Sequence, residues 1–513
     1  MQANQSSGVG QLGQIPIQFI PAYQRVSLHA LKVQRGDELT DRTGSVSIRF
    51  LDTEPALDQG VYSGGAVANL LLDDVRVGDI VHITYSVEGA NPVMQDYFND
   101  SASWDRTEGI DLRVVELVAP RGRGVDWKMV GGGVAAVVPK VIDDNGNTVT
   151  TFEQRDLAPV DDEPQLPSDY LSARFLQLSS FRSWNEVARW AAALFPPVAT
   201  LPPELQQVLA DARKLPTPEA RVAHVLHWVQ SEIRYFSVSF GESSHRPYAP
   251  GEVIARRYGD CKDKSYLLVT LLRALDIEAR PLLVSVRSPR GARLLLPTPY
   301  AFDHVIVEVR IGEQRYQIDG TRFAQPPSVP LAMLTPAMPN TQALPATTDA
   351  GSLIDLPPAP PKLAVNELDE RIEVKSFDEP PTLVATSVMS GMMAEIVRYG
   401  WQQMTPEQRA RVANAGYEKR YPGAKPLAPP VLHDDPAGNR ITLVTRMTLP
   451  NAIREREGDR GISYTVDNFN GFFNIPEKPG RKSPALVAAV PSIARYRLTV
   501  VWPDNVSRML DPV

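Results

Sequence analysis

Residues 256–264 have the sequence RRYGDCKDK and hold the only cysteine among the 513 residues of the chain. The chain continues as SYLLVTLLRALDI, and four of its leucines repeat at the spacing of one helical face, at positions 268, 271, 272 and 275. Cys261 lies seven residues before Leu268 and therefore on the same face. The pattern predicts a helix that starts at the cysteine, with the thiol on its buried side and Lys262 and Asp263 mainly on the other face.

The start of a helix changes the chemistry of a thiol. The first turn has unpaired backbone N–H groups and the positive end of the helix dipole, and both favour a thiolate over a thiol. Lys262 and Lys264 add positive charge, and the N–H of Cys261 can hold an oxyanion. Gly259 lets the chain turn sharply before the sulfur. We predict that Cys261 is a nucleophile; the alternative is an inert buried thiol, the commoner role of a lone cysteine.

A nucleophilic thiol needs a base and a group that orients the base. His304 opens one predicted strand, and Asp319 ends the next. A two-residue turn, at either 312–313 or 311–312, places both side chains on one face, whereas a three-residue turn separates them. With the turn at 312–313, His304 faces Thr321 and has Asp319 as its diagonal neighbour; with the turn at 311–312, it faces Asp319 directly.

The composition limits the class of protein. The length suggests about three or four domains, and the 46 prolines exceed the average share of about 5%, which favours β-rich domains with many turns. The net charge of −7 includes no long run of one sign, so we expect no nucleic-acid partner. No apolar run approaches the roughly 20 residues of a transmembrane segment, and the polar start MQANQSSGVGQLGQ is unlike a signal peptide. A single cysteine excludes an internal disulfide and a Cys-x-x-Cys zinc site.

Changes in periodicity divide the chain into four segments. Residues 1–160 alternate like an antiparallel β domain, with strands expected at 45–51, 79–87, 111–118 and 147–152. Residues 165–328 predict a compact α+β domain, with helices at 182–196 and 217–234 and strands at 280–287, 304–311 and 314–319. The proline-rich residues 329–365 predict a linker or an extended strap. Residues 366–513 return to β structure, with one helix near 391–415 and strands at 371–376, 382–389, 440–448 and 495–502; its end soon after a strand leaves truncation of this domain open.

The segment around Cys261 resembles the transglutaminase-like branch of the papain-like cysteine superfamily. Bacterial members carry Arg-x-Gly-Asp-Cys-Lys-Asp-Lys, a leucine-rich helix, His-Val and Asp-x-Thr; this chain has RYGDCKDK at 257–264, DHV at 303–305 and DGT at 319–321. IRY at 233–235 and RPY at 246–248 are also similar to that branch. More loosely, residues 70–92, with DVRVGD at 74–79, resemble a β domain of unknown function that often precedes it. The resemblance implies a papain-like or transglutaminase-like α+β core flanked by antiparallel β-rich domains.

The same resemblance implies a Cys261–His304–Asp319 triad that transfers the acyl group of an amide bond in a peptide or protein substrate. Cys261 would form a thioester, His304 would move the proton, and Asp319 would hold the imidazole tautomer. The N–H of Cys261 and Tyr248 would hold the oxyanion, because the family's second donor lies upstream of the cysteine helix. Family members of this layout are commonly exported in bacteria, which implies a periplasmic or secreted protein.

Departures from the family pattern bear on the reaction. Animal cross-linking enzymes have Gln before the cysteine and Trp after it, whereas this chain has Asp260 and Lys262. Hydrolysis, of the protease or amidase kind, is therefore favoured over transamidation. The alternative function is that of a non-catalytic binding or scaffold protein of the cell envelope, which would use the papain-like core and the β domains to hold partners.

No metal or cofactor site is expected from the remaining motifs. His224 and His227 lie three residues apart on a predicted helix, but no third ligand has suitable spacing. The glycines at 131–133 follow no clear strand and open no clear helix, so phosphate binding is not expected.

Overall fold

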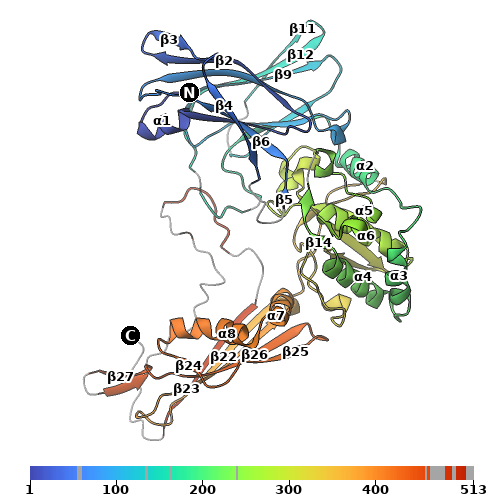
Figure 1. The fold of residues 1–513 in the computed structure, drawn as a ribbon, viewed down its shortest axis with the longest axis vertical. Helices are drawn as coiled ribbons and strands as arrows, with labels where there is room; N and C mark the ends of the chain where they lie inside the picture. The colour runs from blue at the N-terminus through green and yellow to red at the C-terminus, as the bar shows by residue number, and fades with distance from the viewer. Residues whose placement is uncertain are drawn as a thin grey trace.

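The computed structural model describes residues 1–54, 61–132, 137–161, 163–167, 169–238, 241–349, 351–456, 459–462, 476, 480–487 and 493–503. Gly133 of the glycine run and the chain end from residue 504 lie outside this set. An N-terminal β region, an α+β core and a C-terminal β region follow one another along the long axis (Figure 1). This arrangement confirms the predicted multidomain fold with an α+β core between β-rich domains. Among the described residues, no helix is long and apolar enough to cross a membrane.

The first part of the N-terminal region consists of two antiparallel sheets, of order β1–β6–β4 and β3–β2–β7. Its elements are α1 (Ser6–Leu12), β1 (Gln14–Phe19), β2 (Arg25–Arg35), β3 (Glu38–Asp41), β4 (Ser47–Thr53), β6 (Gly65–Leu71) and β7 (Ile80–Glu88). Leu31, Leu70 and Val81 are buried in one cluster with the other apolar side chains of these elements. The predicted strand at 45–51 corresponds to β4, but its apolar face is largely exposed, since β4 is an edge strand and Phe50 is 66% exposed.

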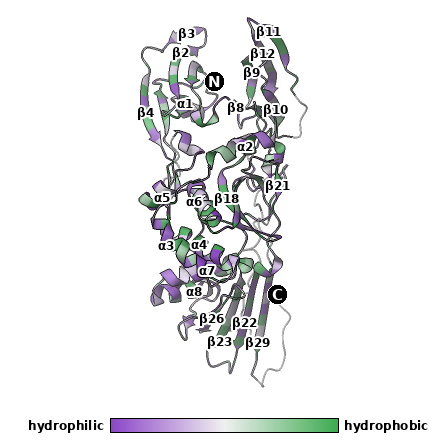
Figure 2. Ribbon diagram, turned by 90° about the vertical axis from the view of Figure 1, so that its right-hand side faces the viewer, coloured by the Kyte–Doolittle hydropathy of each residue, from purple (hydrophilic) through white to green (hydrophobic). Residues whose placement is uncertain are grey.

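Two further antiparallel sheets, of order β11–β12–β9 and β10–β13–β8, complete the N-terminal region. Their strands are β8 (Asn99–Ser103), β9 (Ile110–Pro120), β10 (Asp126–Val130), β11 (Lys140–Asp144), β12 (Asn147–Leu157) and β13 (Phe175–Ser179). Trp104, Phe152 and Leu176 form their core and have no exposed surface. Seen from the side, β2, β3 and β4 lie on one side of this region and β9, β11 and β12 on the other (Figure 2). Because β13 pairs with β8 and β10, the β structure continues to Ser179, past the expected boundary at residue 160.

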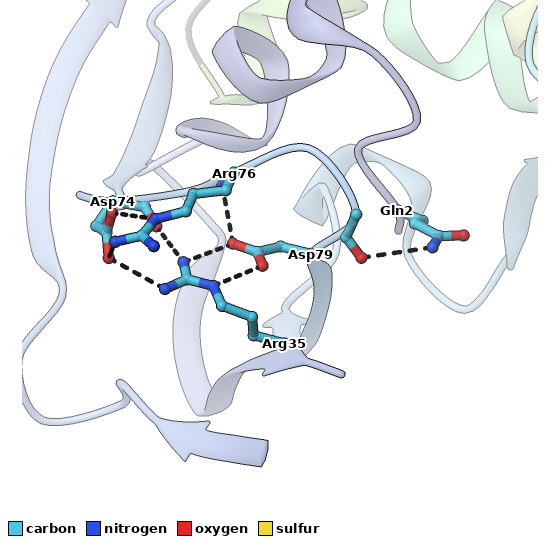
Figure 3. A network of polar contacts seen from close by, with 6 residues as sticks. Gln2, Arg35, Asp74, Arg76 and Asp79 are labelled. Atoms are coloured by element: carbon cyan, nitrogen blue, oxygen red, sulfur yellow. Dashed lines mark hydrogen bonds and ion pairs between the residues drawn. The ribbon is translucent and has the colours of Figure 1, made fainter. Parts of the chain in front are cut away.

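A charge network holds the turn between β6 and β7 (Figure 3). Asp79, which is 1% exposed, accepts hydrogen bonds of 2.9 Å from Nε and Nη2 of Arg35 and one of 2.8 Å from the backbone N–H of Arg76. Asp74 pairs with the same two arginines. The hydrogen bonds from Arg35 lower the pKa of Asp79 to about 2. The DVRVGD stretch at 74–79 therefore has a structural role, because it ties this turn to β2.

The core packs helices against an antiparallel sheet of order β19–β18–β17–β20–β21. Its helices are α2 (Trp184–Leu194), α3 (Glu204–Arg213), α4 (Pro218–Glu232), α5 (Pro250–Arg256) and α6 (Cys261–Arg273). Its strands are β17 (Glu278–Val284), β18 (His304–Ile311), β19 (Gln314–Ile318), β20 (Gln342–Pro345) and β21 (Ile354–Asp355). The leucine face of α6 is buried against Val307 and Val309 of β18, as the spacing predicts. A parallel pair of β5 (Val61–Tyr62) with β15 (Ser237–Val238) joins the N-terminal region to the core.

Part of the predicted linker belongs to the core instead. β20 pairs with β17, and β21 pairs with β20, so residues 342–345 and 354–355 extend the core sheet. Val329, Leu331 and Leu334 are also buried, in the same apolar cluster as α6. The proline content of this segment suggested an open strap, but Pro345 stands at the end of β20, where a missing N–H is tolerated.

The C-terminal region contains a six-stranded sheet of order β24–β26–β23–β22–β29, to which β25 is added beside β26, and a separate two-stranded sheet of β27 and β28. Its elements are β22 (Val365–Glu373), β23 (Thr382–Ser390), α7 (Met392–Gln403), α8 (Pro406–Arg420), β24 (Lys425–Pro426), β25 (Val431–Asp435), β26 (Arg440–Thr448), the hairpin β27 (Ile453–Arg456) and β28 (Asp459–Ile462), and β29 (Ile493–Val501). The sheet is antiparallel except for the pair β22–β29, which is parallel and departs from the expected arrangement. The single helix expected near 391–415 is two helices, because Thr405 caps a new helix with Pro406 at its first position.

We expect Gly391→Ala to lower the melting temperature of the C-terminal region by several degrees. Gly391 has a φ of +58°, and an added Cβ would lie 2.0 Å from the carbonyl oxygen of Leu363. Strain of this kind costs about 1–3 kcal/mol, and differential scanning calorimetry would detect it. Gly416→Ala on α8 is the matched control, because nothing lies within 4 Å of its added Cβ. Alanine there should leave the transition unchanged or raise it slightly, so equal losses in both variants would contradict the prediction.

Candidate active site

A capping box fixes the start of α6. The Asp260 carboxylate accepts hydrogen bonds from the backbone N–H groups of Lys262 and Asp263, and Oδ2 of Asp263 accepts the N–H of Asp260 at 3.1 Å. The cap leaves the N–H of Cys261, the first helical residue, available. Gly259 is needed for close packing, because an added Cβ would lie 2.7 Å from Cβ of Asp263. Burial and the neighbouring charge of Asp260 raise the pKa of Asp263 to about 6.

The two lysines beside the cysteine do not provide free positive charge. Lys262 is 5% exposed and forms an ion pair with Asp260, whose Oδ2 also accepts a hydrogen bond of 3.0 Å from Ser237. Lys264 is 1% exposed and donates to the carbonyl of Ile233, and burial lowers its pKa to about 8. The expectation that Lys262 and Asp263 lie on an outer face is therefore wrong. The charged side chains of Lys262, Asp263 and Lys264 in the first turn of α6 are buried, and buried charges require partners.

The hairpin β18–β19 turns at Gly312 and Glu313, since Ile311 pairs with Gln314. This is the register predicted for a two-residue turn at 312–313, in which Asp319 is the diagonal neighbour of His304. Nε2 of His304 and Oδ2 of Asp319 are 2.8 Å apart. Oδ1 of Asp319 accepts hydrogen bonds of 2.7 Å from both the N–H and the hydroxyl of Thr321. The structure thus brings together the two side chains that the register argument paired.

The His304 imidazole also contacts Cys261, which is partly exposed. Because Asp319 occupies Nε2, Nδ1 is the nitrogen left for the sulfur. Burial disfavours the charged imidazole, but hydrogen bonds with Asp319 and Cys261 outweigh it and raise the pKa of His304 to about 11. The carboxylate of Asp319 keeps a lowered pKa in spite of its burial, because His304 and Thr321 donate to it. An imidazolium beside a sulfur can stabilise a negative charge on that sulfur.

Tyr248, the predicted second oxyanion donor, has other partners in the described part of the chain. Its hydroxyl accepts a hydrogen bond of 3.1 Å from Ser243, its N–H donates to Asp263, and the Arg256 guanidinium lies 4.1 Å above its ring. The structure favours Tyr235 for a position near the sulfur. Tyr235 ends β14 (Arg234–Tyr235), which pairs in parallel with β16 (Tyr258–Gly259) just before the capping box.

The charged groups of this site affect the pKa of Tyr235. Partial burial and the nearby Cys261 and Asp260 raise its pKa well above the usual value, so its hydroxyl stays protonated at neutral pH. Sequence reasoning assigned no role to this residue. The available signal was its place in IRY at 233–235, a stretch that already showed the family resemblance.

His245 is a partly buried histidine whose pKa is shifted in the opposite direction to that of His304. Burial and the nearby charge of Lys262 lower its pKa to about 4, and its ring contacts Trp190 and Tyr300 edge-on. Of the pair on α4, His227 bonds through Nδ1 to the carbonyl of Gln325. Over the residues that the structure describes, no three His, Cys, Asp or Glu side chains are grouped so that they could hold a metal ion.

Two segments of the chain match known family models. Residues 1–161 match the family model of a domain of unknown function, DUF3857, and residues 206–319 match that of the transglutaminase-like superfamily. No curated protein matches the chain.

Solved structures are similar at low sequence identity. A "putative protease" from Parabacteroides distasonis is 13% identical, with 86% of each chain covered and a TM-score of 0.54, which shows a shared fold. A "putative cysteine protease" from Cytophaga hutchinsonii is 15% identical over 45% of this chain and 80% of that one, with a TM-score of 0.21. The periplasmic domain of TgpA from Pseudomonas aeruginosa is 14% identical over 57% and 87%, with a TM-score of 0.20. The last two scores are too low to carry an argument.

We expect His304 to remain an imidazolium at pH 8, while His245 is already neutral at pH 6. The reason is that the pKa is about 11 for His304 and about 4 for His245. Imidazole ¹⁵N chemical shifts of histidine-labelled protein would measure both, with His304→Gln and His245→Gln to assign the signals. Since the His304 value lies above the usual 6.5, its contribution to stability is full below about pH 6.5 and is lost as the pH rises through about 11.

Asp319→Asn is the control for that titration. Without the carboxylate, the pKa of His304 should fall toward the usual value, because the hydrogen bond and the charge of Asp319 both raise it. A parent signal that titrates near pH 6.5, or a variant that titrates like the parent, would contradict the prediction.

Proposed function

Since the chain carries a transglutaminase-like domain at residues 206–319 behind a DUF3857 domain, we propose that it is a cysteine-dependent enzyme acting on amide bonds of peptides or proteins. One observation carries the proposal. On one side His304 contacts Cys261, which is the first residue of a capped helix. On the other side it is hydrogen-bonded to Asp319. This is the order of nucleophile, base and orienting group that thiol catalysis requires.

The reaction begins with the sulfur of Cys261 attacking the carbonyl carbon of the amide, with the thiol proton held on Nδ1 of His304. The C–N bond then breaks, and His304 gives that proton to the leaving amine, so that a thioester and a free amine form. Water attacks the thioester, His304 takes its proton, and the acid and the thiol are released. Asp319 keeps the imidazole oriented through both halves.

The oxyanion of each tetrahedral intermediate needs two donors. The N–H of Cys261 is the first, because the Asp260 cap leaves it available. We assign the second to the hydroxyl of Tyr235 in place of Tyr248, since Tyr235 pairs with Gly259 just before the cysteine helix, whereas the hydroxyl of Tyr248 is bonded to Ser243.

Hydrolysis and transamidation differ only in whether water or an amine attacks the thioester. Asp260 and Lys262, which replace the residues flanking the cysteine in animal cross-linking enzymes, are buried and paired with each other. Neither offers a surface that would hold an acceptor amine, and this supports hydrolysis.

We expect iodoacetamide to label Cys261 at a rate that is already at its plateau near neutral pH. In His304→Ala the rate should rise only above about pH 8, as for an ordinary cysteine, and should fall by roughly tenfold or more at pH 6. Intact-mass spectrometry measures the rate, and the lone cysteine makes the signal specific. His433→Ala, outside the site, is the matched control and should label like the parent.

A parent rate that follows the pH dependence of free cysteine would overturn the enzymatic proposal in favour of a binding or scaffold role. Given an activated thiol, a peptide library with and without an added amine identifies the reaction, with Cys261→Ala as the blank. Cleavage that does not depend on the amine indicates hydrolysis, and incorporation of the amine indicates transamidation.

A further inference from the structure

A cavity of about 460 Å³ lies between the N-terminal region and the core. Tyr23, Tyr97 and Phe175 line it from the N-terminal region, and Thr298 and Tyr300 line it from the loop that leads into β18. A volume of this size is within the range of small-molecule and side-chain binding sites. The cavity is therefore built by both domains.

The lining of the cavity has a defined chemistry. Its aromatic residues are Tyr23, Tyr97, Phe98, Phe175 and Tyr300. Asp100 is the one charged residue among the described lining residues, which include no lysine, arginine or histidine. Partial burial raises the pKa of Tyr300, and the nearby Tyr23 and Asp100, which line the same cavity, add to the effect. Aromatic faces beside a carboxylate attract a cation and offer an anion no partner.

The cavity adjoins the candidate active site through shared residues. Met94 and Tyr97 line it and also belong to the apolar cluster against which Cys261 packs. Tyr300 contacts His245, which is close enough to Lys262 to be affected by its charge. The lining loop continues directly into His304, and Asp303 holds its end through the N–H groups of Val286 and Arg287.

We propose that this cavity binds a lysine or arginine side chain of the peptide substrate, close to the acyl group that Cys261 attacks. The proposal rests on the proposed function and adds a substrate class to it. The N-terminal region thereby selects the substrate of the core, since most of the cavity wall comes from it.

The test uses the full chain and a set of tripeptidyl chloromethyl ketones, with lysine, norleucine or glutamate placed in turn at each of the three positions. The readout is the rate of Cys261 modification by each probe divided by the iodoacetamide rate. At one position we expect the lysine probe to react about tenfold faster than the norleucine probe, with the glutamate probe slowest. Asp100→Asn and Tyr300→Leu should each reduce that preference several-fold. Asp111→Asn on β9, outside the cavity, is the matched control and should keep it.

The outcomes separate the two proposals. An activated thiol with no lysine preference at any position, or a preference that survives Asp100→Asn, would overturn the cavity assignment alone. A thiol that reacts with iodoacetamide like free cysteine would overturn the proposed function, and the substrate assignment with it.

A second inference comes from a chain of buried hydrogen bonds that ends at Asp319. Nε2 of Gln230 donates to the carbonyl of Asp319 and to Oε1 of Gln325, both at 2.9 Å. The N–H of Gln325 donates back to Gln230 at 2.8 Å, and its Nε2 donates to Oε2 of Glu395 at 2.6 Å. Glu395 lies on α7 of the C-terminal region. The chain therefore runs from the candidate site into another domain.

The Glu395 carboxylate is surrounded by donors and has no exposed surface. Besides Gln325, it accepts hydrogen bonds from Arg322 at 2.9 Å, from the N–H of Thr335 at 2.8 Å, and from Asn439 at 2.8 Å. Arg322, Gln325 and Thr335 belong to the segment that follows Asp319, whereas Asn439 precedes β26. Glu395 of the C-terminal region thus holds the segment 322–335, which follows Asp319, through three hydrogen bonds.

We infer that Glu395 is a positioning residue for Asp319, acting through Gln325 and Gln230. Glu395→Gln keeps the shape of the side chain but places an amide N–H against the N–H donors of Arg322 or Gln325. Glu395→Asp keeps the negative charge, but the side chain is one methylene shorter and its carboxylate lies farther from these donors. Both should lower the His304 pKa in the ¹⁵N titration, because Asp319 shifts away from the imidazole. Both should also slow iodoacetamide labelling at pH 7 about tenfold or more.

Glu370→Gln is the matched control, since it removes the buried ion pair with Arg420 within the C-terminal region, and Glu370 is bonded to neither Gln325 nor Asn439 among the described contacts. It should lower the melting temperature and leave the His304 titration unchanged. If folded Glu395→Gln or Glu395→Asp protein titrates and labels like the parent, Glu395 is a structural residue only and the inference fails. Either variant is sufficient for the test if the other does not fold.

Discussion

The hydrogen bond between His304 and Asp319 depends on a single two-residue turn. With Gly312 and Glu313 at the tip of the β18–β19 hairpin, both side chains fall on one face, and the imidazole can reach Cys261 with its second nitrogen. One more residue in the turn would send Asp319 to the opposite face. The charge state of the imidazole, the orientation of its ring and its contact with the sulfur all follow from that register.

The start of the cysteine helix α6 places several charged side chains away from water. Asp260, Lys262, Asp263 and Lys264 are all at most 5% exposed, an unusual concentration of buried charge for one helical turn. The capping box, the Lys262–Asp260 pair and the carbonyl of Ile233 satisfy these groups. The charged side chains of the motif therefore hold the helix start in place, and the thiol depends on them for its position rather than for a free cation beside it.

The sequence predicted those features of the molecule that local patterns determine. The leucine spacing predicted α6 and its buried face, and the parity of the hairpin predicted the proximity of His304 and Asp319. It did not reach contacts that depend on distant segments. The burial of Lys262 and Lys264 comes from strands and loops packed around α6, and β20 was hidden by the prolines around it. The place of Tyr235 follows from its pairing with residues 258–259, which no periodicity reveals.

The parallel pair of β22 and β29 has a consequence for biosynthesis. Val365 is paired with Ile493, so the sheet that presents α7 cannot close until the ribosome has made residues 493–501. Until then β22 is an edge with unsatisfied N–H and C=O groups, the kind of surface that chaperones shield and that seeds aggregation. Because Glu395 reaches the core from this region, a nascent chain would complete its thiol site only after residues 493–501 have been translated.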